Sequence, residues 1–120
     1  MDTRDKIASG ADCAPRLAGL RLSCPALRVV SGYFDPLLAG HAATLEEAAA
    51  GAPALAVVVL DPPGAILPAR ARAELVASLA SVSLVLLPSA GDSIPADASL
   101  EARQLAMRER FIAHVHERQS

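Results

Sequence analysis

Residues 54–60, Ala-Leu-Ala-Val-Val-Val-Leu, are apolar at every position, and the run stops at Asp-Pro-Pro-Gly. A strand that faces solvent on one side alternates apolar and polar residues, whereas a strand buried on both faces does not. The run is therefore predicted to be a central strand of a parallel sheet that ends at the Pro-Pro-Gly turn. Further mainly apolar runs occupy residues 27–30, with Arg28 as the one polar residue, and residues 82–87, with Ser83 as the one polar residue. We expect all three runs to be strands of one small sheet.

The segments between these runs carry helix signals. Asp12 is a plausible N-cap, Gly51 supplies a C-terminal stop, and Pro68 suits the first turn of a helix. The predicted helices span residues 13–21, 39–50, 68–80 and 98–117. Leu45 is the expected apolar anchor of the second helix, and Leu75, Val76 and Leu79 are expected to face inward in the third. Strands that alternate with helices across short loops form right-handed βαβ units. We therefore predict one α/β domain over residues 1–120, a three-layer, Rossmann-like fold with a small parallel sheet.

Charge and hydropathy argue against two classes of partner. The formal net charge is −2, and the arginines are scattered, so no basic surface for nucleic acid is expected. No apolar run reaches the roughly 18 residues of a membrane span, and the first ten residues are mostly polar, unlike a secretion signal. We expect a cytoplasmic protein with neither a nucleic acid nor a membrane as partner.

The metal-ligating residue types do not form a predicted metal site. Cys13 and Cys24 lack the Cys-x-x-Cys spacing and a neighbouring histidine, so they are expected to be free structural thiols. His114 and His116 are two residues apart in a predicted helix, and their side chains would point in nearly opposite directions. No resident metal ion is therefore predicted.

Residues 29–41 have the layout of a strand, a tight turn and a helix start. The apolar run breaks at Gly32, passes through Phe-Asp-Pro, and gives way to an alanine- and glutamate-rich segment that opens with Gly40 and His41. A helix N-terminus presents backbone N–H groups and a positive dipole end, which favour anions. Ligands of parallel sheets bind beyond the carboxyl ends of the strands. We expect a site there, near residues 31–36, 61–64 and 87–90.

The same residues resemble a family signature. Nucleotidylyltransferases of the cytidylyltransferase-like superfamily carry Gly-x-Phe-Asp-x-x-His-x-Gly-His, and here every fixed letter matches except that Leu38 replaces the first histidine. Among the subfamilies, the chain looks most like the adenylyltransferase domain that acts on heptose 1-phosphate. Leu-Glu-Glu-Ala at residues 45–48 and the segment at 67–79 carry this likeness, which covers about residues 5–87.

The resemblance implies a function. Such an enzyme binds ATP or CTP with Mg²⁺, transfers the nucleotidyl group to a sugar or polyol phosphate, and releases pyrophosphate. His41 would then be the catalytic residue, as a donor to the phosphates. The residues that the resemblance places in the nucleotide site are Gly32, Tyr33, Phe34, Asp35, Leu38, Gly40, His41 and Arg72.

Departures from the family pattern favour an alternative function. Leu38 removes one of two paired donors, and no match is found to the family's closing Ile-Ser-Thr-Ser-like motif, whose helix N-terminus helps hold the triphosphate. The domain is therefore expected to be truncated, with only a C-terminal helix at 98–117. The alternative is a catalytically inactive member that serves as a protein-interaction or regulatory module. The uncovered edges of a three-stranded sheet make a homodimer plausible.

Several candidate residues also have a purely structural interpretation. His41 could cap or pack at the helix start, and Asp35 could orient the turn through backbone N–H groups. Phe34 is expected to be a core residue rather than a base-stacking platform. Arg72 is expected to be solvated on the helix surface, and Asp61 to form the turn before Pro-Pro rather than hold a ribose hydroxyl or a metal ion.

Overall fold

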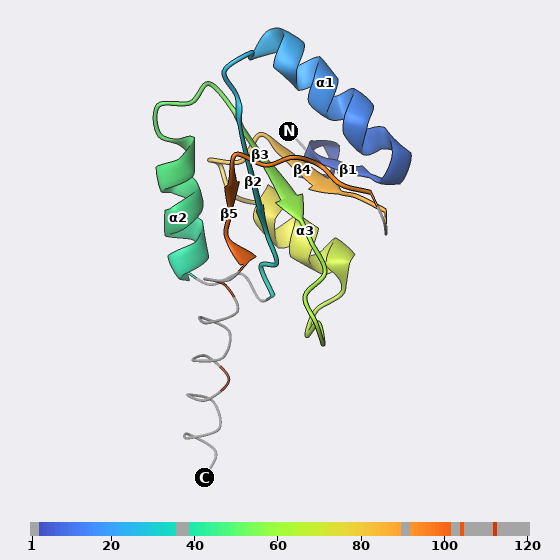
Figure 1. Cartoon of the computed structure of the whole chain (residues 1–120). Helices are drawn as coiled ribbons and strands as arrows, with labels where there is room; N and C mark the ends of the chain where they lie inside the picture. The colour runs from blue at the N-terminus through green and yellow to red at the C-terminus, as the bar shows by residue number, and fades with distance from the viewer. Residues whose placement is uncertain (1–2, 36–38, 90–91, 102–103, 105–111, 113–120) are drawn as a thin grey trace.

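A single parallel sheet organises the chain. The computed structural model describes residues 3–35, 39–89 and 92–101 together with residues 104 and 112 (Figure 1). The sheet has five strands in the order β1-β4-β3-β2-β5, and every pair is parallel. The strands are β1 (Ile7–Ser9), β2 (Arg28–Gly32), β3 (Leu55–Val59), β4 (Leu84–Leu87) and β5 (Ala98–Ser99).

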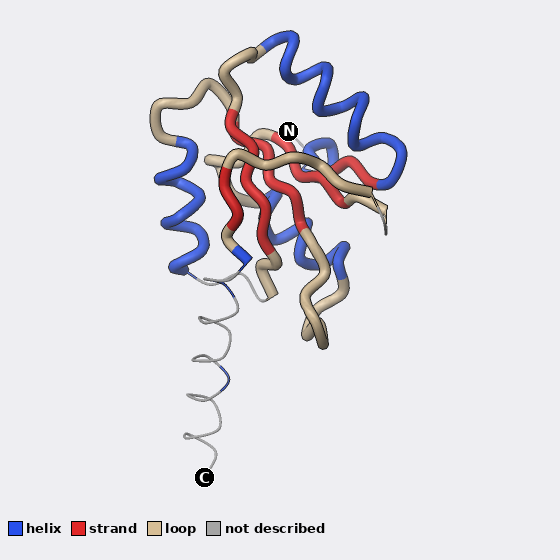
Figure 2. The backbone as a smooth tube through the Cα atoms, viewed as in Figure 1, coloured by secondary structure: helices blue, strands red, loops and turns tan. Residues whose placement is uncertain are grey.

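Three α-helices connect the strands and cover both faces of the sheet, which forms the central layer (Figure 2). The helices are α1 (Cys13–Ser23), α2 (Ala39–Ala49) and α3 (Ala69–Ala77), with short 3₁₀ helices η1 (Thr3–Lys6) and η2 (Gly10–Asp12) before α1. α2 and α3 pack on one face, and α1 packs on the other. The domain is thus a small Rossmann-like α/β fold with three layers, as predicted.

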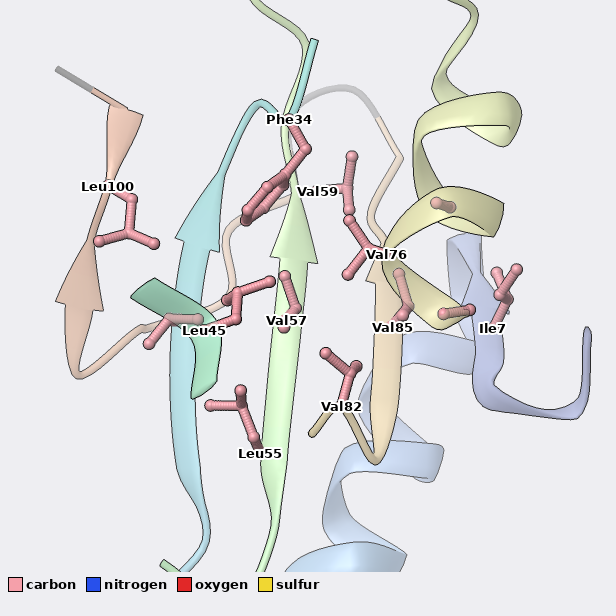
Figure 3. Packing of buried hydrophobic residues seen from close by; sticks show 13 residues of the cluster. Ile7, Phe34, Leu45, Leu55, Val57, Val59, Val76, Val82, Val85 and Leu100 are labelled. Atoms are coloured by element: carbon pink, nitrogen blue, oxygen red, sulfur yellow. The ribbon is translucent and has the colours of Figure 1, made fainter. Parts of the chain in front are cut away.

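The central strand is as buried as its sequence predicts. All five residues of β3 are buried, and successive residues serve opposite faces. Val57 belongs to the cluster beneath α2 and α3, whereas Val58 belongs to the cluster beneath α1. Leu45, the predicted apolar anchor of α2, is fully buried among Val57 and its neighbours (Figure 3). This double burial explains why the run carries no polar residue.

The helix predictions are confirmed at Gly51 and Pro68 and are wrong at Asp12 and Leu75. Gly51 adopts φ +79° just after α2, the left-handed conformation of a helix stop. Pro68 occupies the N-cap position of α3. Asp12 occupies that of α1, but its side chain makes no capping hydrogen bond, contrary to expectation. Leu75 was also expected to face inward, but it is exposed, and Val76 beside it is the buried residue.

The predicted three-stranded sheet is wrong, because two short edge strands extend it. β1 lies in the lead-in segment and pairs with β4, so Ile7 and Ala8 become buried. β5 falls inside the segment that was expected to be helical from residue 98. It pairs with β2 instead, where Leu100 N donates to Ser31 O at 2.9 Å.

The helical prediction for 98–117 holds only in part within the described residues. Residues 101, 104 and 112 are helical, and Gln104 N donates to Leu100 O at 3.0 Å. His114 and His116 lie outside the described residues. None of the helices described above is long and apolar enough to cross a membrane.

The two cysteines, both in the described part of the chain, are free thiols with different surroundings. Cys13 is buried under α1, where its Sγ donates to Ala8 O at 3.5 Å. Burial raises the pKa of the Cys13 thiol, so its reactive thiolate is scarcer at neutral pH. Cys24 is half-buried at the end of α1.

Alkylation of the native protein with iodoacetamide at neutral pH is therefore expected to modify Cys24 first. Cys13 should react at least roughly 10-fold more slowly, because burial hinders access to its sulfur and the raised pKa lowers the fraction of reactive thiolate. Peptide mass spectrometry over time measures both rates. In denaturant the two rates should converge. A native Cys13 that reacts first would contradict the burial of this helix start.

Candidate functional site

The predicted site residues gather at the carboxyl ends of β2 and β3. β2 ends at Gly32, and Tyr33, Phe34 and Asp35 follow in the loop that leads toward α2. Leu38 lies outside the described residues. His41 is in the first turn of α2, Gly40 before it is exposed, and Arg72 reaches the same edge from α3. The fold thus brings together residues that are up to 40 positions apart in the signature and the second crossover helix.

Phe34 is a core residue, as its structural interpretation predicted. Its side chain is fully buried and points into the cluster beneath α2 and α3 (Figure 3). The imidazole of His41 meets the ring edge-on, with centroids 5.9 Å apart and an interplanar angle of 89°. The backbone of Phe34 adopts φ +52°, a rare conformation for a bulky residue. Such strain persists only where the surroundings impose it, and it often marks functional loops.

Asp35 joins two loops. Its carboxylate is buried and accepts hydrogen bonds from Ile66 N at 2.6 Å and Leu67 N at 2.7 Å. Asp35 was predicted to orient its own turn through backbone N–H groups, whereas these two N–H groups belong to the loop after β3. Asp35 therefore holds the 61–67 loop against the end of β2.

The prediction that Arg72 is solvated is wrong, because only 1% of the residue is exposed. Its Nε donates to Leu67 O at 3.1 Å, and its Nη1 donates to Leu60 O at 2.6 Å and to Tyr33 O at 3.2 Å. Its Nη2 pairs with Asp61 Oδ1 at 2.6 Å. Tyr33 and Leu60 directly follow the ends of β2 and β3, and the branched guanidinium can reach the carbonyl oxygens of both at once. Arg72 thus connects α3 by hydrogen bonds to the loop after β2 and to the loop after β3.

Gln104 is the site residue that sequence reasoning missed. It is 3% exposed, and its Oε1 accepts hydrogen bonds from two successive backbone N–H groups, those of Tyr33 and Phe34, the second at 3.3 Å. The Nε2 of Gln104 is buried without a hydrogen-bond partner among the described residues. No local signal could reveal this role, since the partners are 70 or more positions apart.

The glycine at position 32 leaves room for this contact. A Cβ there would lie 2.5 Å from Oε1 and 2.7 Å from Nε2 of Gln104, so the Gln104 side chain would have to move. The sequence left open whether Gly32 admits a phosphate or a neighbouring strand, and the group that approaches is a side-chain carboxamide. Beside it, Ser31 Oγ donates to Glu101 Oε1 at 2.6 Å, so residues 101 and 104 both face the end of β2.

The carboxylates of the described residues form no metal centre: no three of their His, Cys, Asp and Glu side chains cluster as ligands. The Asp61 carboxylate is 80% exposed, but it already pairs with Arg72. Any Mg²⁺ at this edge would therefore have to take most of its ligands from a bound nucleotide and water, as Mg²⁺ commonly does.

The chemistry available at the end of β2 is that of an oxyanion site. Two adjacent N–H groups that point at one oxygen form the concave arrangement in which backbone amides bind anions. The imidazole of His41, in the first turn of α2, contacts the ring of Phe34 in this loop. No model of a known protein family matches this chain, and no match to it is found among curated proteins.

Proposed function

We propose that this protein is a nucleotidylyltransferase-like domain that binds ATP or CTP through their phosphates beyond the carboxyl end of β2. One observation carries the proposal: the N–H groups of Tyr33 and Phe34 converge on a single oxygen atom. A phosphate oxygen carries charge and accepts such bonds more strongly than a neutral oxygen. The Gly-x-Phe-Asp and Gly-His elements of the signature flank this position.

His41 would contribute a further donor. It lies in the first turn of α2, whose positive dipole end favours an anion. Phe34 packs against the imidazole and limits its orientation. A ring held in this way loses little freedom when it donates to a phosphate, which favours binding.

The reaction would be an in-line displacement at the α-phosphorus. A phosphate oxygen of the sugar or polyol phosphate forms a bond to this phosphorus, while the bond to the bridging oxygen breaks and pyrophosphate leaves with the electron pair. The protein needs to position both groups and to stabilise the charge on the phosphoryl oxygens, with Mg²⁺ arriving on the nucleotide. Leu38 supplies no donor, and a missing donor of this kind slows catalysis roughly 100- to 1000-fold. We expect binding with slow turnover.

A second function is favoured by the structural use of the polar groups. Asp35 accepts from two N–H groups of the 61–67 loop, and Arg72 donates to backbone carbonyl groups of Tyr33, Leu60 and Leu67. An inactive domain that keeps the fold for protein contact needs them only in that role. β5 is a two-residue, exposed edge strand, and an uncovered edge is a surface on which a second copy could pair.

Calorimetric titration with ATP and with CTP, each with Mg²⁺, tests the proposal. Binding in the micromolar to sub-millimolar range is expected, and His41→Ala should weaken it roughly 10- to 100-fold through the loss of one hydrogen bond to a charged group. Thr44→Ala, in the same helix but bonded only to Gly40 O, is the matched control and should bind normally. Because His41 is buried, thermal melts must show that both variants fold.

The outcome that contradicts the proposal is an absence of heat with both nucleotides. This test requires the wild-type chain and also a chain without the Gln104 carboxamide, because that carboxamide occupies the N–H groups of Tyr33 and Phe34. The inactive domain would then be the remaining function, and sedimentation would test for the homodimer.

A further inference from the structure

Gln104 occupies the position where the proposed function needs a phosphate oxygen. Its Oε1 already accepts the Tyr33 and Phe34 N–H groups, and its carboxamide lies directly over Gly32. We infer that this carboxamide is an internal occupant of the phosphate site, and that nucleotide binds only after it has left. The inference rests on the proposed function and concerns the regulation of the same site.

Only one of the two polar atoms of the Gln104 carboxamide has hydrogen-bond partners among the described residues. Oε1 has two donors, but Nε2 is buried without an acceptor among the described residues. A buried donor that lacks a partner destabilises the state that contains it. Among the described residues the Nε2 donor is thus unsatisfied in the occupied state, and withdrawal of Gln104 into solvent would let water accept from it.

Charge favours the exchange. A neutral amide oxygen is a weaker acceptor than a phosphate oxygen, so the two N–H groups gain when the anion replaces the carboxamide. The carboxamide has one advantage, because it is tethered and competes at a high effective concentration. The apparent affinity for nucleotide is then the intrinsic affinity reduced by the fraction of molecules in which the site is open.

The exchange does not require the neighbouring segment to detach. Leu100 is buried and its N–H bonds to Ser31 O, while Ser31 Oγ bonds to Glu101. These contacts anchor residues 100 and 101 beside β2 without the help of Gln104. A change in the side-chain rotamers of Gln104 alone would vacate the space over Gly32.

Titration of ATP with Mg²⁺ into wild-type, Gln104→Ala and Gln104→Glu chains tests the inference. Gln104→Ala is expected to bind roughly 10-fold more tightly, because the site is always open. Gln104→Glu should bind more weakly than wild type, because a carboxylate holds the N–H groups better and repels phosphate. Gln104→Met, whose side chain cannot accept the Tyr33 and Phe34 N–H bonds, should also bind more tightly than wild type, and it guards against misfolding of the alanine variant. Glu101→Gln, which leaves the carboxamide in place, is the matched control.

Amide NMR provides a readout that does not depend on nucleotide. In Gln104→Ala without ligand, the N–H resonances of Tyr33 and Phe34 should move, and sodium triphosphate should shift them again. Unchanged affinity in both Gln104→Ala and Gln104→Met overturns the inference but leaves the proposed function intact. Weaker binding in both also overturns it, because Gln104 would then be a ligand contact. If no variant binds nucleotide or triphosphate, the proposed function itself fails.

Discussion

Replacement of Arg72 by alanine is expected to lower the free energy of unfolding by about 3–5 kcal/mol, the largest loss among the substitutions considered. The guanidinium donates to three backbone carbonyl groups and pairs with one carboxylate. Alanine leaves those carbonyl groups without their charged donor. It also opens a cavity in the protein interior, because Arg72 is only 1% exposed.

Most of this loss should come from the carbonyl groups rather than from the ion pair. Asp61, the acidic partner, is 80% exposed, and the solvent screens such a charge. Asp61→Ala should therefore change the free energy of unfolding by no more than about 1 kcal/mol. Arg72→Lys should lower the free energy of unfolding nearly as much as Arg72→Ala, because one ammonium group cannot reach all the carbonyl and carboxylate acceptors of the guanidinium.

Urea unfolding followed by circular dichroism measures these differences. Arg70→Ala is the matched control on the same helix: its Nε pairs with Glu74 at 3.4 Å, and both side chains are half-exposed, at 52%. It should lower the free energy of unfolding by about 0.5 kcal/mol or less. If Arg72→Ala lowered the free energy of unfolding as little as Arg70→Ala, the idea that Arg72 stabilises the two loops would be refuted.

Asp35→Asn is expected to lower the free energy of unfolding by about 2–4 kcal/mol. The two carboxylate oxygens each accept one backbone N–H, from Ile66 and from Leu67. Asparagine offers one oxygen and one NH₂ group, so one N–H would face another donor in a buried position. The neutral amide also loses the charge assistance of the remaining bond. The substitution should thus be almost as harmful as Asp35→Ala, even though the shape is kept.

The same unfolding experiment tests this prediction, with Asp92→Asn as the control at an exposed loop position. Asp35 and Arg72 also share a partner, since Asp35 accepts from Leu67 N and Arg72 donates to Leu67 O. The double variant Asp35→Asn/Arg72→Ala should therefore lose less unfolding free energy than the sum of the losses in the two single variants. Strict additivity would show that the two side chains hold the loop independently.

The architecture follows closely from the sequence pattern. The apolar run at β3, the Pro-Pro-Gly turn after it and the glycine at position 51 are local signals, and each appears in the fold where it was predicted. The strand–turn–helix layout around Gly32 and His41 is likewise confirmed. The edge strands were missed because Ile7–Ser9 and Ala98–Ser99 are too short to show a period, and β5 exists only through its pairing with β2.

The sequence by itself determined the fold class, because burial on both faces and the order of strand, turn and helix leave local marks. Only the tertiary structure decided what the polar groups at the carboxyl ends of β2 and β3 do. Arg72 is buried and donates to the carbonyl group of Tyr33, 39 positions away, and Gln104 accepts from the N–H of Phe34, 70 positions away. The physical reason is that a hydrogen-bond partner is chosen by which strand ends meet, and no local pattern of residue types records that meeting.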